Sequence, residues 1–187
     1  MRRTRPHVPA QVAVLVAVLG CAAPACAGRG PAARTAPVPD GGRGLVATVT
    51  HVVDGDTIDV RLPAGAAERV RLLGIDTPET VKTDTPVQCG GPEASAHTKA
   101  LLPPGTAVLL QRDVEARDRY GPLLAYVWRA RDGRFVNRDL LTGGYARILS
   151  IRPNTTRAAE LAAASSAARA AGRGVWGACP SSSGPGP

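Results

Sequence analysis

The chain has 187 residues, of which 44% are hydrophobic and only 3% aromatic, and its formal net charge is +8. This composition supports one packed core made mostly of alanine, valine and leucine, and it excludes broad aromatic stacking surfaces. No apolar run reaches the roughly 18 to 20 residues that cross a bilayer, so we expect no transmembrane helix in the mature chain. Six arginines and one aspartate precede Gly44, which leaves +3 for residues 44–187. This mildly basic body is compatible with a polyanionic partner but does not establish one.

The N-terminal segment has the organisation of a secretory signal. Three arginines lie among the first seven residues, the apolar run Val12–Gly20 follows, and small residues come next. We therefore predict that residues 1–21 are a signal peptide and that the protein is exported. Two processing sites compete: the four residues that end at Cys21 resemble a bacterial lipobox, whereas Ala25-Cys26-Ala27 is an ordinary cleavage site. We favour the lipobox slightly, and a lipidated Cys21 would tether the protein to a membrane.

Composition also sets the domain boundaries. Residues 22–44 are rich in alanine, glycine, proline and arginine without apolar periodicity, and residues 180–187 read PSSSGPGP. We predict a disordered linker and a disordered tail there. The folded domain is then expected at 45–179, which is long enough for one modest core.

Two cysteines, Cys89 and Cys179, lie within this domain. An even pair in an exported domain is typical of a disulfide, and two free buried thiols are the alternative. A zinc site has little support, because it needs about four ligands and neither His51 nor His97 stands at a recognisable spacing from a cysteine.

Local patterns predict strands before helices. Alternating and β-branched residues indicate strands at 45–53, 57–62, 69–75, 106–112 and 123–128. Proline and glycine signals indicate helices at 92–102, 136–141 and 156–171. Because strands and helices do not alternate as in βαβ units, we predict a mainly β, α+β domain: a small closed barrel with about three appended helices. Trp128, Phe135 and Trp176 are expected in its core or capping it, and His97 in a structural role.

Three aspartates lie at sharp turns beside the predicted strands. Asp54 and Asp56 follow the first strand, and Asp76 follows the third. Carboxylates on short rigid turns suit a hard cation. They also occur in ordinary capped turns, because aspartate accepts hydrogen bonds from its own backbone there. The turns alone leave both interpretations open.

Four ordered motifs make the pattern specific. They are Asp-Gly-Asp-Thr at 54–57, RLLGIDTPET at 71–80, GPEASA at 91–96 and Asp-Arg-Tyr-Gly at 118–121. From about Leu45 to Trp176, this sequence resembles the staphylococcal nuclease (thermonuclease) family. The resemblance implies a five-stranded OB-fold barrel with three helices. It also implies a calcium-dependent phosphodiesterase that acts on DNA and RNA.

The resemblance assigns a metal site by motif position. The Asp56 and Asp76 carboxylates and the Thr77 carbonyl would hold Ca²⁺, and Asp54 would act through contacts behind these ligands. A divalent cation suits this chemistry, because it offsets the charge that grows on a phosphodiester during attack.

It likewise assigns the reacting groups. Glu79 would orient or deprotonate the attacking water, and Arg71 would pair with the scissile phosphate. Tyr120 and Arg119 would contact the substrate. The structural alternatives are a surface ion pair of Arg71 with an acid on a neighbouring strand, Asp59 or Glu68, and a solvated loop position for Glu79.

Two positions depart from the family. Pro122 occupies the place of a second catalytic arginine, and a proline side chain cannot donate a hydrogen bond. Arg117 or Arg119 could substitute for it from the same turn. Ser150 and Arg152 stand where family members often carry tyrosines near the base, and base stacking contributes about 1 to 3 kcal/mol.

These observations leave two leading functions. An exported calcium-dependent nuclease with weakened activity is favoured by the presence of Asp56, Asp76, Arg71 and Glu79 together. A non-catalytic OB-fold module that binds nucleic acid or a partner is favoured by Pro122, and no specific protein partner is indicated. A structural envelope lipoprotein would leave the acids unexplained.

Overall fold

The computed structural model describes residues 35–39, 42–80 and 86–179, all within one compact unit, Pro31–Pro187. The expected signal peptide at 1–21 with Cys21, most of the linker at 22–44, and the tail at 180–187 lie outside the described residues. Within the described ranges, no helix is long and apolar enough to span a membrane.

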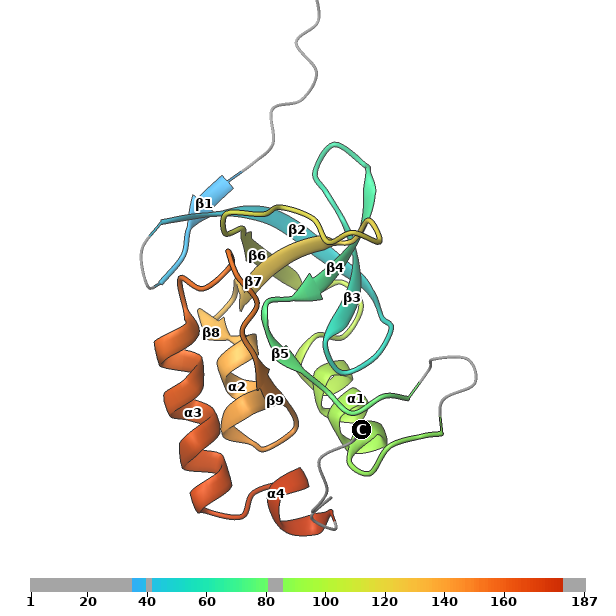
Figure 1. The fold of residues 1–187 in the computed structure, drawn as a ribbon. Coiled ribbons are helices and arrows are strands. Elements are labelled where there is room, and N and C mark those ends of the chain that lie inside the picture. Colours follow the sequence, from blue (N-terminus) through green and yellow to red (C-terminus); the bar gives the residue numbers. More distant parts are fainter. Residues whose placement is uncertain (1–34, 40–41, 81–85, 180–187) are drawn as a thin grey trace, which may run out of the picture. The chain divides into compact units, whose positions relative to one another are not determined.

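Five strands close into a barrel (Figure 1). In ring order they are β2 (Arg43–Val52), β3 (Thr57–Arg61), β4 (Ala67–Leu72), β7 (Leu123–Arg129) and β6 (Ala107–Gln111). Neighbours pair antiparallel except β4 and β7, which run parallel, and β6 pairs with β2 to close the ring. The predicted five-stranded OB-fold barrel is therefore confirmed.

Short strands extend this barrel. β1 (Thr35–Pro37) pairs with the start of β2, β8 (Arg134–Phe135) pairs with β7, and β5 (Gly74–Asp76) pairs with β9 (Arg147–Leu149) in a separate small sheet. The β1 segment and the buried Val38 fall in the stretch expected to be a linker. That expectation differs from the structure because a three-residue strand beside one apolar side chain gives no periodic signal.

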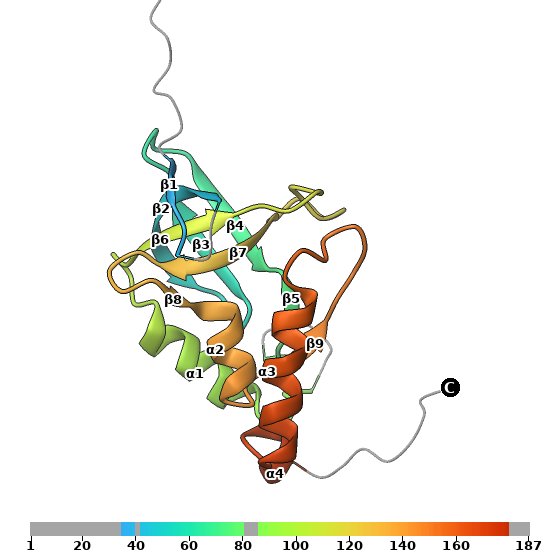
Figure 2. The same ribbon diagram turned by 90° about the vertical axis from the view of Figure 1, so that its left-hand side faces the viewer.

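The three expected helices lie together on one side of the barrel (Figure 2). They are α1 (Gly91–Leu101), α2 (Val136–Thr142) and α3 (Ala158–Ala170), and a single turn, α4 (Val175–Ala178), follows. Pro92 lies in the first turn of α1, where its missing N–H costs nothing. The predicted number of helices is confirmed.

Aromatic side chains occupy the places expected of them. The rings of Trp128 and Phe135 stack with centroids 4.5 Å apart, and both side chains are buried. Trp176 lies beneath two arginines, with the guanidinium carbon of Arg147 5.0 Å from its ring centroid. His97 stacks on Tyr145 at 4.1 Å, and its Nε2 atom lies 2.8 Å from the Asp139 carboxylate. It thus joins α1 to α2.

The third expected strand is broken at Gly74. Residues 69–75 were predicted as one strand, but β4 ends at Leu72 and β5 starts at Gly74, whose φ is +78°. A side chain here would also collide with Leu161 of α3, so only glycine fits. The break directs Ile75 and Asp76 out of the barrel and toward β9. Tertiary packing therefore determines where Asp76 lies.

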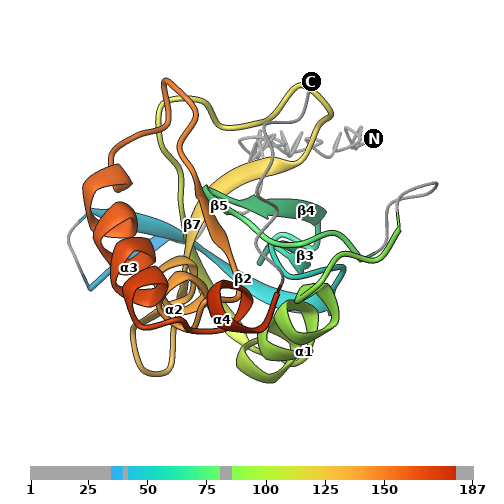
Figure 3. The same cartoon turned by 60° about the horizontal axis from the view of Figure 1, so that its bottom comes forward.

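A disulfide joins Cys89, just before α1, to Cys179, just after α4. Figure 3 views this end of the domain, where α4 lies near α1. The bond connects residues 90 positions apart in the sequence, and the predicted pairing is present in the structure.

We expect Asn137→Leu to lower the stability of the folded domain. The buried Asn137 side chain accepts a hydrogen bond from the Val127 N–H at 2.9 Å and donates one to the Leu73 carbonyl at 2.8 Å. Leucine would leave two buried backbone groups unpaired, so the free energy of unfolding should fall by about 2 to 4 kcal/mol in urea titration. The exposed neighbour Arg138→Leu, which loses one surface ion pair, should cost less than about 1 kcal/mol. Equal losses in the two variants would contradict this role.

Candidate functional site

The Asp54-Gly55-Asp56 turn connects β2 to β3 and is packed on two sides. The Asp56 N–H donates to the Asp54 carboxylate at 3.1 Å, and the Gly55 carbonyl accepts from the Thr98 hydroxyl of α1 at 2.7 Å. A Cβ on Gly55 would lie 2.7 Å from the Thr77 hydroxyl oxygen, so glycine allows the turn and Thr77 to meet. The turn is therefore held against the segment that follows β5.

Asp56 is the most buried carboxylate of this group, with 2% of its surface exposed. One oxygen, Oδ2, accepts the Thr77 N–H at 2.9 Å, and the other, Oδ1, accepts the Thr57 hydroxyl at 3.0 Å. Burial raises the pKa of Asp56 to about 6, although the Arg71 charge lowers it, and the nearby Asp54 charge raises it further. Because burial is the largest of these causes, a cation bound at the Asp56 carboxylate would favour its ionised form.

Arg71 of β4 connects two of the acids. Its Nη2 atom lies 2.9 Å from Asp76 Oδ1 and 3.4 Å from Asp56 Oδ2. The Arg71 side chain is 36% exposed and that of Asp76 is 53% exposed, so both reach solvent. One nitrogen therefore brings together carboxylates from the β2–β3 turn and from the end of β5.

The alternative partners of Arg71 are held by other arginines. Asp59 pairs with Arg69 at 2.8 Å, and Glu68 pairs with Arg117 at 2.8 Å. The interpretation of Arg71 as a simple surface ion pair with one of these acids is wrong.

The oxygen donors fit a hard cation. In the described part of the chain, no three histidine, cysteine, aspartate or glutamate side chains form a group that could hold a metal. Asp56 and Asp76 supply two carboxylates, and burial, which raises the pKa of Asp56, gives that carboxylate a reason to be partnered by a cation when it is ionised. Calcium takes carboxylate and backbone carbonyl oxygens together with water. A cation here would therefore need the Thr77 carbonyl and water beside these two carboxylates.

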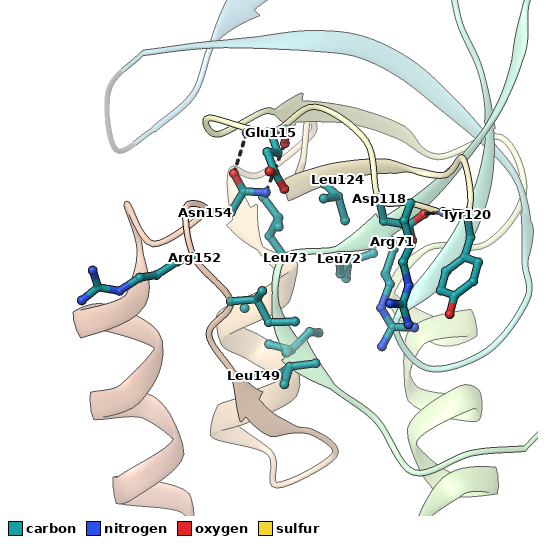
Figure 4. A pocket seen from close by; sticks show the side chains of 14 residues that line it. Arg71, Leu72, Leu73, Glu115, Asp118, Tyr120, Leu124, Leu149, Arg152 and Asn154 are labelled. Carbon is teal, nitrogen blue, oxygen red and sulfur yellow. Dashed lines mark hydrogen bonds between the residues drawn. The ribbon is translucent and has the colours of Figure 1, made fainter.

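A cavity of about 560 Å³ opens beside Arg71. Figure 4 shows Arg71, Asp118 and Tyr120 grouped on one side of it and Leu149 on the other. Tyr120 is 77% exposed, and the Arg119 guanidinium carbon lies 4.7 Å from its ring centroid. The structure thus brings both expected substrate residues to the same cavity as Arg71.

The opposite wall contains one of the two positions, Ser150 and Arg152, where family members often carry tyrosines. Leu149, Ile151 and Arg152 line the cavity, whereas Ser150 does not. In Figure 4 the Arg152 side chain points away from Arg71. Leu149 and Ile151 make part of this wall aliphatic, and none of the lining residues from 149 to 154 carries an aromatic ring for stacking.

Asn154 fixes this wall and was not singled out from the sequence. Its buried amide accepts from the Glu115 N–H at 2.8 Å and donates to the Glu115 carbonyl at 3.1 Å. These paired bonds tie the loop before β7 to the segment after β9. The only sequence signal is an asparagine in a turn-rich Pro-Asn-Thr stretch, which is also typical of ordinary turns.

The arginines near Pro122 have different roles. Arg117 donates to both Glu68 oxygens, at 2.8 and 3.0 Å, and to the Gly121 carbonyl at 2.8 Å. Arg119 instead lines the cavity. Pro122 lies outside that lining, and its carbonyl accepts from the Asp118 N–H at 3.1 Å. Of the two candidate replacements, Arg119 is the one that reaches the cavity.

Glu79 lies on the segment that follows Asp76. Its carboxylate accepts the Thr80 N–H at 2.9 Å, and its own N–H donates to the Gln88 side-chain oxygen at 3.0 Å. The side chain is half-buried rather than fully solvated. Gln88, which the sequence analysis did not identify, therefore contacts the backbone of the expected base.

The raised pKa of Asp56 predicts how stability depends on pH without metal. A carboxyl group whose pKa is higher in the folded state than in the unfolded state stabilises the fold below pH 3.8. This contribution is lost as the pH rises toward about 6. Asp56→Asn should therefore gain stability relative to the parent between these pH values, by roughly 3 kcal/mol. Urea unfolding with chelator at several pH values measures the difference.

Asp59→Asn provides a control of opposite sign. Hydrogen bonding to Arg69 lowers the pKa of Asp59. The ionised Asp59 side chain therefore stabilises the fold above pH 3.8, and this stabilisation is lost at lower pH. The stability of Asp59→Asn relative to the parent should therefore fall as the pH rises through the acid range. A flat profile for Asp56→Asn would contradict the buried, charge-rich environment.

Comparisons with known proteins agree with this geometry. The model of the family described as staphylococcal nuclease homologues matches residues 69–178. Thermonuclease from Staphylococcus hyicus is 41% identical over 128 residues, which cover 68% of this chain and 73% of that protein. Thermonuclease from Staphylococcus intermedius is 46% identical over 112 residues, or 60% of this chain and 64% of that protein. Endonuclease YncB from Bacillus subtilis (strain 168) is 42% identical over 109 residues, which are 58% of this chain and 50% of that protein. The chain folds as an OB barrel that carries the Asp56, Arg71 and Asp76 cluster. Because the family model also covers more than half of the chain, this protein belongs to the staphylococcal nuclease family.

Proposed function

We propose that this protein is a calcium-dependent nuclease that hydrolyses phosphodiester bonds in DNA and RNA. The observation that carries the proposal is the Arg71 nitrogen that bridges Asp56 and Asp76 at the edge of the cavity lined by Tyr120. The relatives named thermonuclease and endonuclease support a nuclease.

The proposed chemistry assigns one task to each group. Arg71 binds a phosphate oxygen, because its partly exposed guanidinium lines the cavity and reaches solvent there. Ca²⁺ held by Asp56, Asp76 and the Thr77 carbonyl would supply positive charge opposite the phosphate. Glu79 accepts the proton of the attacking water.

Substrate binding falls to the cavity. Tyr120 offers an exposed ring next to the Arg119 cation, and both line the cavity that Arg71 borders. A base and its phosphate can therefore contact the same group of side chains. Leu149 and Ile151 provide apolar contact on the far wall, where an aromatic ring would contribute about 1 to 3 kcal/mol per stacked base.

Ca²⁺ should stabilise the parent protein and activate its cleavage of nucleic acid. Asp56→Ala and Asp76→Ala each remove one of two carboxylates, so both should lose the Ca²⁺-induced rise in Tm. Asp118→Ala, which removes a carboxylate from the same cavity, should keep that rise. Thermal melts with Ca²⁺ or with chelator, together with cleavage of fluorescent DNA and RNA, measure both effects. An equal Tm rise in all four proteins would overturn the metal assignment.

Pro122→Arg should increase turnover if the missing arginine limits the rate. An arginine that contacts charge only in the transition state raises kcat more than it lowers KM. Such arginines contribute on the order of 10³ to 10⁵ in rate, and the altered backbone at the start of β7 would reduce the gain. Steady-state cleavage by the parent, Pro122→Arg, and Pro122→Arg with Glu79→Gln measures it. If Pro122→Arg is no faster and Arg119→Ala is inactive, Arg119 has taken over the role.

Pro122 also favours a second candidate, a non-catalytic module that binds nucleic acid. In that case the parent and Pro122→Arg would both bind fluorescent oligonucleotides and neither would cleave them with Ca²⁺ present. The weakened nuclease and the binding module are separated by this one comparison.

We also propose export, with Cys21 as the lipidated N-terminus and Gly28 as the alternative start. The N-terminal pattern supports this, and the Cys89–Cys179 disulfide agrees, because disulfides persist in oxidising compartments. Mass measurement of the mature protein tests it, since an intact N-terminus at Met1 would contradict export.

A further inference from the structure

The backbone that carries Glu79 is held by Gln88 through a pair of hydrogen bonds. The Glu79 N–H donates to Gln88 Oε1 at 3.0 Å, and the Gln88 N–H donates to the Glu79 carbonyl at 3.0 Å. One residue therefore satisfies both backbone groups of Glu79. Further support of this segment comes from the side of the proposed metal site, where the Thr77 N–H donates to the Asp56 carboxylate.

Glycines after Gln88 pack closely on the same segment. A Cβ on Gly91 would lie 2.7 Å from Thr80 Cγ2 and 3.0 Å from the Glu79 carbonyl oxygen. A Cβ on Gly90 would lie 3.7 Å from both Pro78 Cγ and the sulfur of Cys179. The start of α1 is thus in direct van der Waals contact with the Pro78–Thr80 backbone.

The Cys89–Cys179 disulfide lies directly beside this contact. Cys89 is the residue next to Gln88. Its disulfide partner, Cys179, follows α4 at the C-terminal end of the domain's sequence. Val175 of α4 packs against Gly90, so α4 supports the same turn. A covalent bond and a packed helix therefore restrain the residues on both sides of the Gln88 peptide.

We infer that Gln88 is a positioning residue for Glu79 and that the Cys89–Cys179 disulfide keeps Gln88 in place. The inference rests on the proposed function where it concerns catalysis, because Glu79 is the proposed base. A base must lie within hydrogen-bond reach of the water that it deprotonates, and a displacement of about 1 Å can cost about 10²-fold in rate. The oxidised disulfide is then needed for full turnover.

The first test isolates the side-chain oxygen of Gln88. Gln88→Met keeps the length of the side chain but removes the acceptor, whereas Gln88→Glu keeps an acceptor oxygen. In Gln88→Met we expect amide exchange of the Glu79 N–H, measured by NMR, to be at least about 10-fold faster than in the parent. We expect kcat to fall about 10- to 100-fold with little change in KM. Gln88→Glu should restore most of the amide protection.

The second test breaks the disulfide. Dithiothreitol supplies two electrons and two protons, so that Cys89 and Cys179 become thiols and dithiothreitol becomes its cyclic disulfide. Reduced protein and the Cys89→Ser/Cys179→Ser variant should show the same faster Glu79 exchange and the same loss of kcat as Gln88→Met. Phe135→Leu, a core change in β8, serves as the control for lower global stability. At a temperature where it remains folded, it should leave kcat and Glu79 protection unchanged.

The outcomes separate the two proposals. Unchanged Glu79 exchange in Gln88→Met and in reduced protein overturns the inference, whatever the activity. Faster exchange with unchanged kcat in an active parent also overturns it, because the support then has no catalytic effect. If the parent does not cleave nucleic acid, the proposed nuclease function fails, and the exchange rates still decide whether Gln88 and the disulfide hold Glu79.

Discussion

Asp56 is the point on which the site depends. Its backbone carbonyl accepts the Leu72 N–H at 2.9 Å, while its carboxylate binds the Thr77 N–H and lies near Arg71. This one residue therefore joins the start of β3 to the end of β4 and to the segment after β5. A buried carboxylate is costly without partners, and the hydrogen bonds that satisfy Asp56 are the same ones that align the acids for a cation. Stability and site geometry are set by the same contacts.

The sequence predicted most of the barrel because its strands and helices have local signals. Alternating residues, the Asp54–Asp56 turn, Pro92 and the paired glycines after α2 each determine a boundary without help from distant residues. β1 and β9 were missed, because three-residue strands have no period to detect. The break at Gly74 was missed because its cause is Leu161, a side chain far away in the sequence.

The residues of the candidate site also fall into two groups, those that the sequence identified and those that it did not. Asp56, Arg71 and Asp76 were identified from compact motifs, and the structure brings them together. Their different burial could not be read from the turns, since it depends on packing against Thr77 and α1. Gln88 and Asn154 were not found, because each acts through backbone groups of a distant residue and has no motif of its own. Sequence patterns thus identify the groups with charge and overlook those that hold them.

The parts of the site are also separated along the chain, and this has a consequence for synthesis. The acids and Arg71 lie within residues 54–79, most of the cavity lining comes from residues between 115 and 154, and the bond that closes the domain needs Cys179. A protein is synthesised from its N-terminus, so the ribosome makes the charged residues of the site before most of the cavity lining and before Cys179. A chain that ends before Glu115 carries the acids of residues 54–79 and Arg71 but lacks most of the cavity lining. The assembled site therefore belongs to the finished molecule alone.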